Sequence, residues 1–282
     1  MIDADFSFLQ SFLLRRSGAA LWAEKRYVAD LRLGALVAEH HFADVSVLLA
    51  DVRRQPDGEL AARVVEAMTT NETFFFRDSR PFQHIETVLL PQLAAARRDR
   101  KLLRIWCAAV SSGQEAYSLA ILVARQAALL SSLRVEIVAT DISREMIEKA
   151  RAGRYSHFEV QRGLPIQCLL DNFSQDGETW VIAEPLRRAV DFRVMNLLQD
   201  APGLGQFDLI LLRNVLIHLD MAVKADVLAR AARHLAPDGL LLLGSAESAL
   251  GLGDAVMPHP EHRGFYARTS QAPSRYAVAE RR

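Results

Sequence analysis

The first part of the chain places apolar residues at helical rather than strand spacing. Leu60, Val64 and Met68 recur four residues apart, and similar segments precede them. Gln55-Pro56-Asp57-Gly58 forms a turn signal between two such segments. Because no apolar–polar alternation occurs before residue 100, we expect an all-α N-terminal domain over residues 1–85.

From Leu102 onward, short apolar runs alternate with amphipathic segments. The strand candidates are LLRIWCA, VEIVATD, FDLILL and GLLLLG, and the segments between them have helical spacing. A turn is expected at Pro237-Asp238-Gly239, just before the last run. Alternation of strands and helices is typical of a mostly parallel sheet with helices on both faces. We therefore expect an α/β domain over residues 101–270, joined to the helices by a linker over 86–100.

Residues 157–194 interrupt this alternation. They contain turn-forming residues followed by the runs TWVIA and AVDFRV, which are expected to be short antiparallel strands. The sequence thus predicts a small antiparallel β subdomain inserted in the larger domain. Residues 271–282 are expected to form a loose C-terminal tail.

Composition and charge argue against several classes of protein. The two cysteines, Cys107 and Cys168, offer neither a disulfide framework nor a metal-binding cluster. Lys plus Arg and Asp plus Glu both number 34, so the basic excess of a nucleic-acid-binding protein is missing. No apolar run approaches a membrane-spanning length, and the N-terminus has no basic signal region. We expect a cytoplasmic monomer without metal, nucleic-acid partner or membrane insertion.

Ligands of open parallel sheets bind at the carboxyl ends of the strands, and the first candidate lies there. The small residues from Ala108 to Gly113 would let backbone approach a cofactor, with Glu115 in the next helical turn. The single glycine argues against a dinucleotide-binding G-x-G-x-x-G motif. Alternatively, Ser112 and Glu115 form a capping box that only starts the helix.

Two further strand ends carry candidate residues. Asp141 ends the second run, where a carboxylate can accept the hydroxyls of a ribose. The alternative is a loop aspartate before a helix capped by Ser143. Arg213 and Asn214 follow the buried run FDLILL and are expected to border the cleft, unless they form a turn with a solvated arginine.

The connector MTTNETFFFRD, residues 68–78, fits neither helical nor strand spacing. Its three consecutive phenylalanines could anchor a lid, with Asn71, Thr73 and Arg77 turned toward a ligand. Arginine is a natural partner for a carboxylate on that ligand. The alternative is a hydrophobic joint between domains with a surface arginine.

Six motifs decide between these alternatives. They are MTTNETFFFRD, RIWCAAVSSGQEAYSLA, ATDISREMIEKARAGRY, FRVMNLL, FDLILLRNVLIHLD and LAPDGLLLLGSAES. In this order and at this spacing they resemble the CheR family, whose members methylate glutamates of bacterial chemotaxis receptors. The resemblance extends over roughly residues 6–266.

The resemblance implies a Rossmann-like sheet that binds S-adenosyl-L-methionine, with S-adenosyl-L-homocysteine as product. The β subdomain over 157–194 would be the family's insertion, and the partners would be the cytoplasmic helices of methyl-accepting chemotaxis receptors. No catalytic base is expected, because a glutamate carboxylate is already ionised at neutral pH. Carried over by position, cofactor binding falls on Asn71, Thr73, Arg77, Glu115, Asp141, Asn196, Leu197, Asn214 and Val215.

The chain departs from the family's pattern at a few positions. Val110, Gln114 and Ala116 stand where other residues are usual, and His218 stands where tyrosine is common. We assign no role to His218. The block 181–194 is only a loose match, so the function of the insertion stays open.

Two questions about partners and activity also stay open. A basic cluster could meet an acidic receptor surface, although a charge run is usually a solvated face. A cofactor-binding scaffold without turnover, or an enzyme acting on small molecules or nucleic acid, would be the competing functions. The cluster consists of Arg97, Arg98, Arg100, Lys101 and Arg104.

Overall fold

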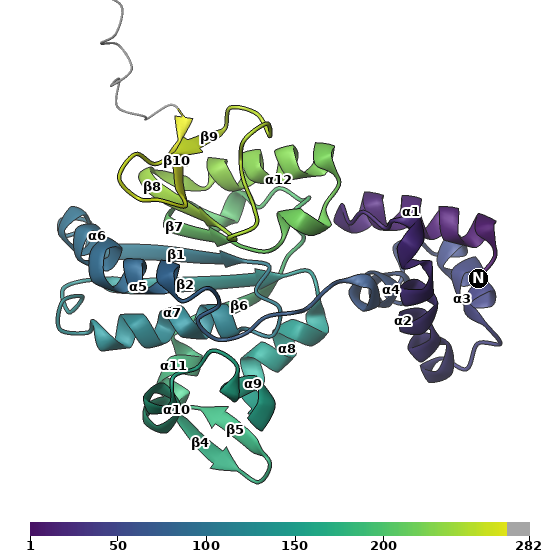
Figure 1. Ribbon diagram of the computed structural model, residues 1–282, viewed down its shortest axis with the longest axis horizontal. Helices are drawn as coiled ribbons and strands as arrows, with labels where there is room; N and C mark the ends of the chain where they lie inside the picture. The colour runs from purple at the N-terminus through teal and green to yellow at the C-terminus, as the bar shows by residue number, and fades with distance from the viewer. Residues whose placement is uncertain (270–282) are drawn as a thin grey trace, which may run out of the picture.

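The structure is a computed structural model that describes residues 1–269, so the tail expected over 271–282 lies outside the described residues. Figure 1 shows a helical unit at the N-terminal end of the chain, beside a sheet covered by helices on both faces. The five parallel strands of the sheet end on the side of the helical unit (Figure 1). The mixed α/β architecture predicted from the sequence is confirmed. Within the described residues, no helix combines the length and apolarity needed to cross a bilayer.

The N-terminal unit contains four α-helices with a core of their own. Leu9, Phe12, Leu33, Leu48 and Val64 are buried in it, since each helix turns one apolar face inward. The predicted turn at residues 55–58 lies between the last two helices, and Asp44 caps the third through the Val47 amide at 2.9 Å. The elements are α1 (Asp3–Ser17), η1 (Ala23–Lys25), α2 (Arg26–Glu39), α3 (Val45–Arg54) and α4 (Glu59–Met68).

The main sheet has seven strands in the order β6-β2-β1-β7-β8-β10-β9. The first five are parallel, and β10 runs antiparallel to both β8 and β9. Its central strands are buried on both faces, as their unbroken apolar runs predict. The strands are β1 (Leu102–Ala108), β2 (Arg134–Asp141), β6 (Val190–Val194), β7 (Phe207–Leu212), β8 (Leu235–Leu243), β9 (Val256–Pro258) and β10 (Phe265–Arg268).

Helices cover both faces of this sheet, and each face has its own apolar cluster. Phe82, Tyr117 and Ile147 belong to the cluster on one face, and Leu228 and Ala231 belong to the cluster on the other. The helices are α5 (Arg80–His84), η2 (Ile85–Leu89), α6 (Leu90–Ala96), α7 (Gln114–Arg125), α8 (Arg144–Ala152), α11 (Glu184–Arg188) and α12 (Met221–Arg233), with short turns η3 (Pro202–Leu204) and η4 (Leu216–His218).

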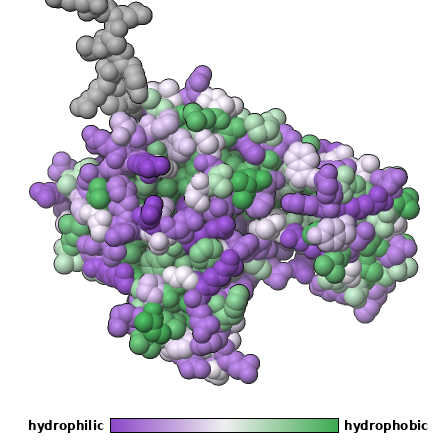
Figure 2. Space-filling view, viewed as in Figure 1, coloured by the Kyte–Doolittle hydropathy of each residue, from purple (hydrophilic) through white to green (hydrophobic). Residues whose placement is uncertain are grey.

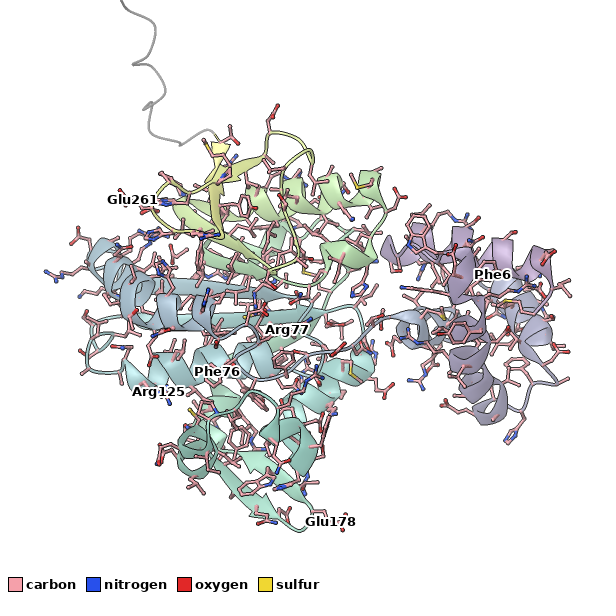
Figure 3. The ribbon with its side chains drawn as sticks, in the orientation of Figure 1. Phe6, Phe76, Arg77, Arg125, Glu178 and Glu261 are labelled. Atoms are coloured by element: carbon pink, nitrogen blue, oxygen red, sulfur yellow. The ribbon has the colours of Figure 1, made fainter. Side chains whose placement is uncertain are left out.

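The insertion is a three-stranded antiparallel sheet in the order β3-β5-β4, with two helices. Figure 2 shows apolar surface on this subdomain, where Ile166 and Leu170 of α10 are exposed. Figure 3 marks Glu178 at the tip of its β4–β5 hairpin. The elements are β3 (Arg154–Ser156), α9 (His157–Gln161), α10 (Ile166–Asn172), β4 (Phe173–Asp176) and β5 (Thr179–Ile182).

The strand expected in AVDFRV is not part of this small sheet. It is β6, which pairs parallel with β2 at the edge of the main sheet. Only Val190 and Phe192 are buried, because one face of an edge strand is open, and this gives β6 the alternation of a half-buried antiparallel strand. The small sheet also begins at Arg154, before the expected boundary at 157.

The turn predicted at Pro237-Asp238-Gly239 is wrong, because these residues lie within β8. The pairing of β8 with β7 shifts register there, between Phe207 and Leu209, as at a β-bulge. A Cβ at Gly239 would lie 2.8 Å from the Phe207 carbonyl oxygen, so glycine allows this close approach of two backbones.

The basic cluster does not form one solvated surface. Arg97 is 3% exposed, and its Nε donates to Asp208 Oδ1 at 2.6 Å while its other nitrogens bind Asp238. Arg104 is half-buried and donates to Glu136 Oε2 at 2.9 Å. These two arginines hold α6 and β1 against their neighbours. Only Arg98, Arg100 and Lys101 remain exposed.

Candidate functional site

A cavity of about 380 Å³ opens where the carboxyl ends of β1, β2, β6 and β7 meet. The connector after α4 and the segment after α1 form its other walls. This volume is in the range of small-molecule sites. All nine residues predicted to bind a cofactor line it: Asn71, Thr73, Arg77, Glu115, Asp141, Asn196, Leu197, Asn214 and Val215.

The loop after β1 brings backbone close to the cavity. Ala109 and Ser111 adopt left-handed backbone conformations, with φ of 58° and 51°. Gly113 has φ of 91°, and a Cβ there would lie 2.8 Å from the Ala150 side chain. The predicted capping box is absent: Gly113 begins α7 without a side-chain cap, and the Ser112 hydroxyl donates instead to Gln114 Oε1 at 2.9 Å.

Asp141 faces the cavity from the end of β2 and is 6% exposed. Its Oδ2 accepts the Ser111 amide at 2.7 Å, and its Oδ1 accepts the Ser143 amide at 2.9 Å. Burial raises the pKa of the carboxyl, while these backbone amides oppose that rise. Ser143 caps α8 through the Met146 amide at 3.2 Å, as the alternative for Asp141 proposed, but Asp141 itself lies on the cavity. Since each carboxylate oxygen can accept a second hydrogen bond, Asp141 could also hold ribose hydroxyls.

Arg213 ties three parts of the site together beneath the cavity. Its Nη1 donates to Glu115 Oε2 at 2.8 Å, and its Nη2 donates to Asp78 Oδ2 at 2.8 Å and to the Arg77 carbonyl at 2.8 Å. The side chain is buried, so the alternative of a solvated arginine is wrong. Burial raises the pKa of the Glu115 carboxyl, and the charge of Arg213 opposes this.

The phenylalanines of the connector anchor it, as predicted. Phe75 is fully buried and packs edge-on against Tyr155 at 5.1 Å and Phe173 at 5.5 Å between ring centroids. Phe76 packs against Phe82 of α5 at 5.5 Å. Figure 3 labels Phe76 and Arg77, neighbours in this connector that crosses in front of the sheet. The connector is therefore fixed by apolar contacts while Arg77 lines the cavity.

Part of the cavity wall comes from the N-terminal unit, which no sequence pattern indicated. Trp22, Lys25 and Arg32 line the cavity. The segment after α1 is held there by backbone bonds, from the Ala20 amide to the His218 carbonyl at 3.0 Å and from the Asp220 amide to the Gly18 carbonyl at 3.1 Å. The Asn196 side-chain amide also donates to the Arg16 carbonyl at 2.7 Å.

His218, to which the sequence assigned no role, also lines the cavity. Burial lowers the pKa of its imidazole, and the nearby charge of Lys25 adds to this effect. The neutral ring is therefore favoured in the folded protein. Its departure from the family's tyrosine was the one signal in the sequence that could have marked it.

These residues suit S-adenosyl-L-methionine. Asp141 offers acceptors for a ribose, Arg77 offers a cation for a carboxylate, and Ile142, Leu197 and Val215 offer apolar surface for a base. A Rossmann-like sheet with these side chains around the carboxyl ends of its strands is that of an S-adenosylmethionine-dependent methyltransferase.

Comparison with known proteins identifies the family. Residues 71–259 match the model described as CheR methyltransferase, SAM binding domain. The chain is 39% identical over 256 residues to Chemotaxis protein methyltransferase 1 of Pseudomonas aeruginosa, covering 89% of this chain and 93% of that protein. It is 40% identical over 257 residues to Chemotaxis protein methyltransferase of Vibrio parahaemolyticus, covering 89% and 92%. This protein belongs to the CheR methyltransferase family.

Proposed function

We propose that this protein transfers the methyl group of S-adenosyl-L-methionine to glutamate side chains of methyl-accepting chemotaxis receptors. The products are glutamyl methyl esters and S-adenosyl-L-homocysteine. The observation that carries the proposal is the shared position of nine family-matched residues around one cavity. The names of the relatives support a role in chemotaxis.

The proposed cofactor contacts follow from the geometry of the cavity. Asp141 would accept the ribose hydroxyls, and Arg77 would bind the carboxylate of the methionine part. Glu115 is held by Arg213 at 2.8 Å, which keeps its carboxylate at a fixed place on the cavity floor. The remaining matched residues line the cavity and would contact the rest of the cofactor. They are Asn71, Thr73, Asn196, Leu197, Asn214 and Val215.

The chemistry asks little of the protein beyond position and exclusion of water. S-adenosylmethionine supplies a methyl group on a sulfonium that reacts readily with nucleophiles. A glutamate carboxylate, with an ordinary pKa of about 4.3, needs no general base at neutral pH. Lys25, Arg32 and Arg77 give the cavity wall positive charge that favours a carboxylate. The chain would hold the reacting groups in line and exclude water through the connector.

The partners we propose are the cytoplasmic helices of chemotaxis receptors, and we infer that the protein acts as a cytoplasmic monomer. The exposed residues Arg98, Arg100 and Lys101 could still attract an acidic receptor surface. The departures at Gln114 and Ala116 do not favour a scaffold without turnover. Both side chains are buried in the packing of α7, and neither lines the cavity.

The test is incubation of the protein with labelled S-adenosylmethionine and receptor-containing membranes. Label released as methanol by mild alkali identifies a carboxyl methyl ester, which is the expected result. A matched reaction with receptors whose candidate glutamates are changed to alanine should lose that label. Cofactor binding without labelled receptor, or alkali-stable label elsewhere, would contradict the proposed substrate.

A further inference from the structure

Arg162 of the insertion and Arg77 of the connector bind the same two residues. Arg162 Nη2 donates to Glu72 Oε1 at 2.5 Å, and its guanidinium lies over the Phe74 ring, 4.5 Å from the centroid. Arg77 Nη1 donates to the Glu72 carbonyl at 3.0 Å, and its guanidinium lies 5.4 Å from the same centroid. Glu72 and Phe74 are thus shared between the insertion and the arginine that lines the cavity.

The backbone next to Arg162 is also fitted to the connector. Gly163 has φ of 83°, and a Cβ there would lie 2.1 Å from the Phe75 carbonyl oxygen. Only glycine permits this approach without displacing one of the two backbones. Because Phe75 is itself packed against Tyr155 and Phe173, the connector rests on the insertion over several residues.

The charges of this contact favour its observed arrangement. The hydrogen bond from Arg162, its charge and that of Arg77 lower the pKa of the Glu72 carboxyl. An ionised Glu72 accepts a charge-assisted hydrogen bond from Arg162, and each guanidinium is attracted to the face of Phe74. Without Arg162, Glu72 and Phe74 would each lose a partner from the insertion, and Arg77 would be less restrained.

We propose that Arg162 is a positioning residue that holds Arg77 in the cavity, so that the insertion controls cofactor affinity. The inference rests on the proposed function only in taking the cavity as the cofactor site. Arg162 does not line the cavity and acts through Glu72 and Phe74. Because Arg77 is already restrained before the cofactor binds, less side-chain conformational entropy is lost on binding, and the affinity is higher.

Calorimetry with S-adenosylhomocysteine on the full chain tests this role. Arg162→Ala should weaken binding about three- to tenfold, because it removes one cation–π contact and one exposed ion pair. It should raise KM for S-adenosylmethionine while changing kcat by less than about twofold, since Arg162 does not touch the reacting groups. Arg162→Lys keeps the charge and should recover part of the affinity.

Arg154→Ala is the matched control. Arg154 lies in the same insertion and binds Asp176 at 2.7 Å, and the two side chains are 47% and 65% exposed, compared with 40% and 57% for Arg162 and Glu72. The Arg154→Ala variant should bind S-adenosylhomocysteine with the same affinity as the unchanged protein. The effects of Arg162→Ala and Phe74→Leu should be non-additive, because both act on one contact.

Unchanged affinity in Arg162→Ala, or an equal loss in Arg154→Ala, would overturn the inference. Additive effects of Arg162→Ala and Phe74→Leu would overturn it as well. Since calorimetry measures cofactor binding alone, these outcomes do not depend on whether receptors are the methyl acceptor. A failure of the inference is therefore distinguishable from a failure of the proposed substrate.

Discussion

The Arg213 guanidinium meets the Glu115 carboxylate at 2.8 Å in the interior of the protein, although 98 residues separate them in sequence. A buried ion pair of this kind adds little net stability, because both charges lose their hydration. Replacing only one residue of the pair is costly, because the other charge then stays buried without a partner. The pair therefore fixes where β7, α7 and the connector meet under the cavity.

Replacing Arg213 should destabilise the fold strongly. Arg213→Met leaves Glu115 buried without its cation and should lower the free energy of unfolding by about 3–5 kcal/mol. Denaturant unfolding measures this change. Arg188→Met is the control, because the Arg188–Glu184 pair is exposed, and it should change stability by less than about 0.5 kcal/mol. A similar small change in both variants would contradict the role given to Arg213.

Replacing Asp141 should weaken cofactor binding. Asp141→Asn removes the negative charge and one of the two carboxylate oxygens that would accept hydrogen bonds from the ribose hydroxyls. It should weaken S-adenosylhomocysteine binding roughly tenfold to a hundredfold. Isothermal titration calorimetry gives the affinity directly. Asp191→Asn, on the exposed face of β6, should leave it unchanged. Equal affinities for Asp141→Asn and the unchanged protein would refute the ribose assignment.

Arg97 and Arg98 should behave differently although they are adjacent. Arg97→Met leaves Asp208, which is 2% exposed, without its ion-pair partner and should cost about 3–5 kcal/mol in unfolding free energy. Arg98→Ala removes only an exposed charge and should cost less than about 0.5 kcal/mol. Thermal and denaturant unfolding of the two variants compare them. Equal stabilities would show that Arg97 is not the structural residue we describe.

Histidines near β10 should make stability depend on pH. Burial lowers the pKa of His259 and His262, and the His84 Nε2–His262 Nδ1 hydrogen bond, at 3.1 Å, needs one neutral ring. The native state therefore binds protons less tightly than the unfolded chain. These neutral histidines therefore contribute to the free energy of unfolding. The contribution is fully present above about pH 6.5, the unfolded pKa of histidine, and decreases as the pH falls from there through the lower native pKa values.

Denaturant midpoints measured between about pH 7.5 and pH 5.5 test this dependence. His262→Gln should flatten the decline without abolishing it, because it removes one ring of lowered pKa and the bond to His84, while His259 and His218 keep theirs. The same slope in His262→Gln and the unchanged protein would exclude His262 as its source.

The sequence predicts the central strands of the α/β domain well, because each has a continuous apolar run, whereas the short strands β9 and β10 carry no such run and were not predicted. LLRIWCA, VEIVATD and FDLILL became β1, β2 and β7, close to their expected bounds. Six of the nine matched residues meet in one cavity because the carboxyl ends of parallel strands share one edge of the sheet, and the other three, Asn71, Thr73 and Arg77, come from the connector that crosses this edge. Local pattern and this general rule were sufficient for that part.

What the sequence did not reveal depends on contacts between distant residues. The sequence around Arg97 does not reveal that Asp208 and Asp238 lie beside it in the fold. Arg97 was therefore assigned to the exposed basic cluster together with its neighbours in sequence. The edge position of β6 made it look antiparallel. Trp22 and Lys25 reach the cavity only because the N-terminal unit docks on the sheet, and no local pattern records that docking.

Backbone hydrogen bonds join the segment after α1 to the loop after β7, at Ala20–His218 and Gly18–Asp220. Backbone bonds of this kind are indifferent to most side-chain replacements on either segment. They depend instead on the number of residues between α1 and η1. These bonds therefore tolerate most replacements in this segment, apart from Gly18 and from the residues that line the cavity, such as Trp22, while a gain or loss of one residue there would misalign the helical unit and open one wall of the methyl-donor site.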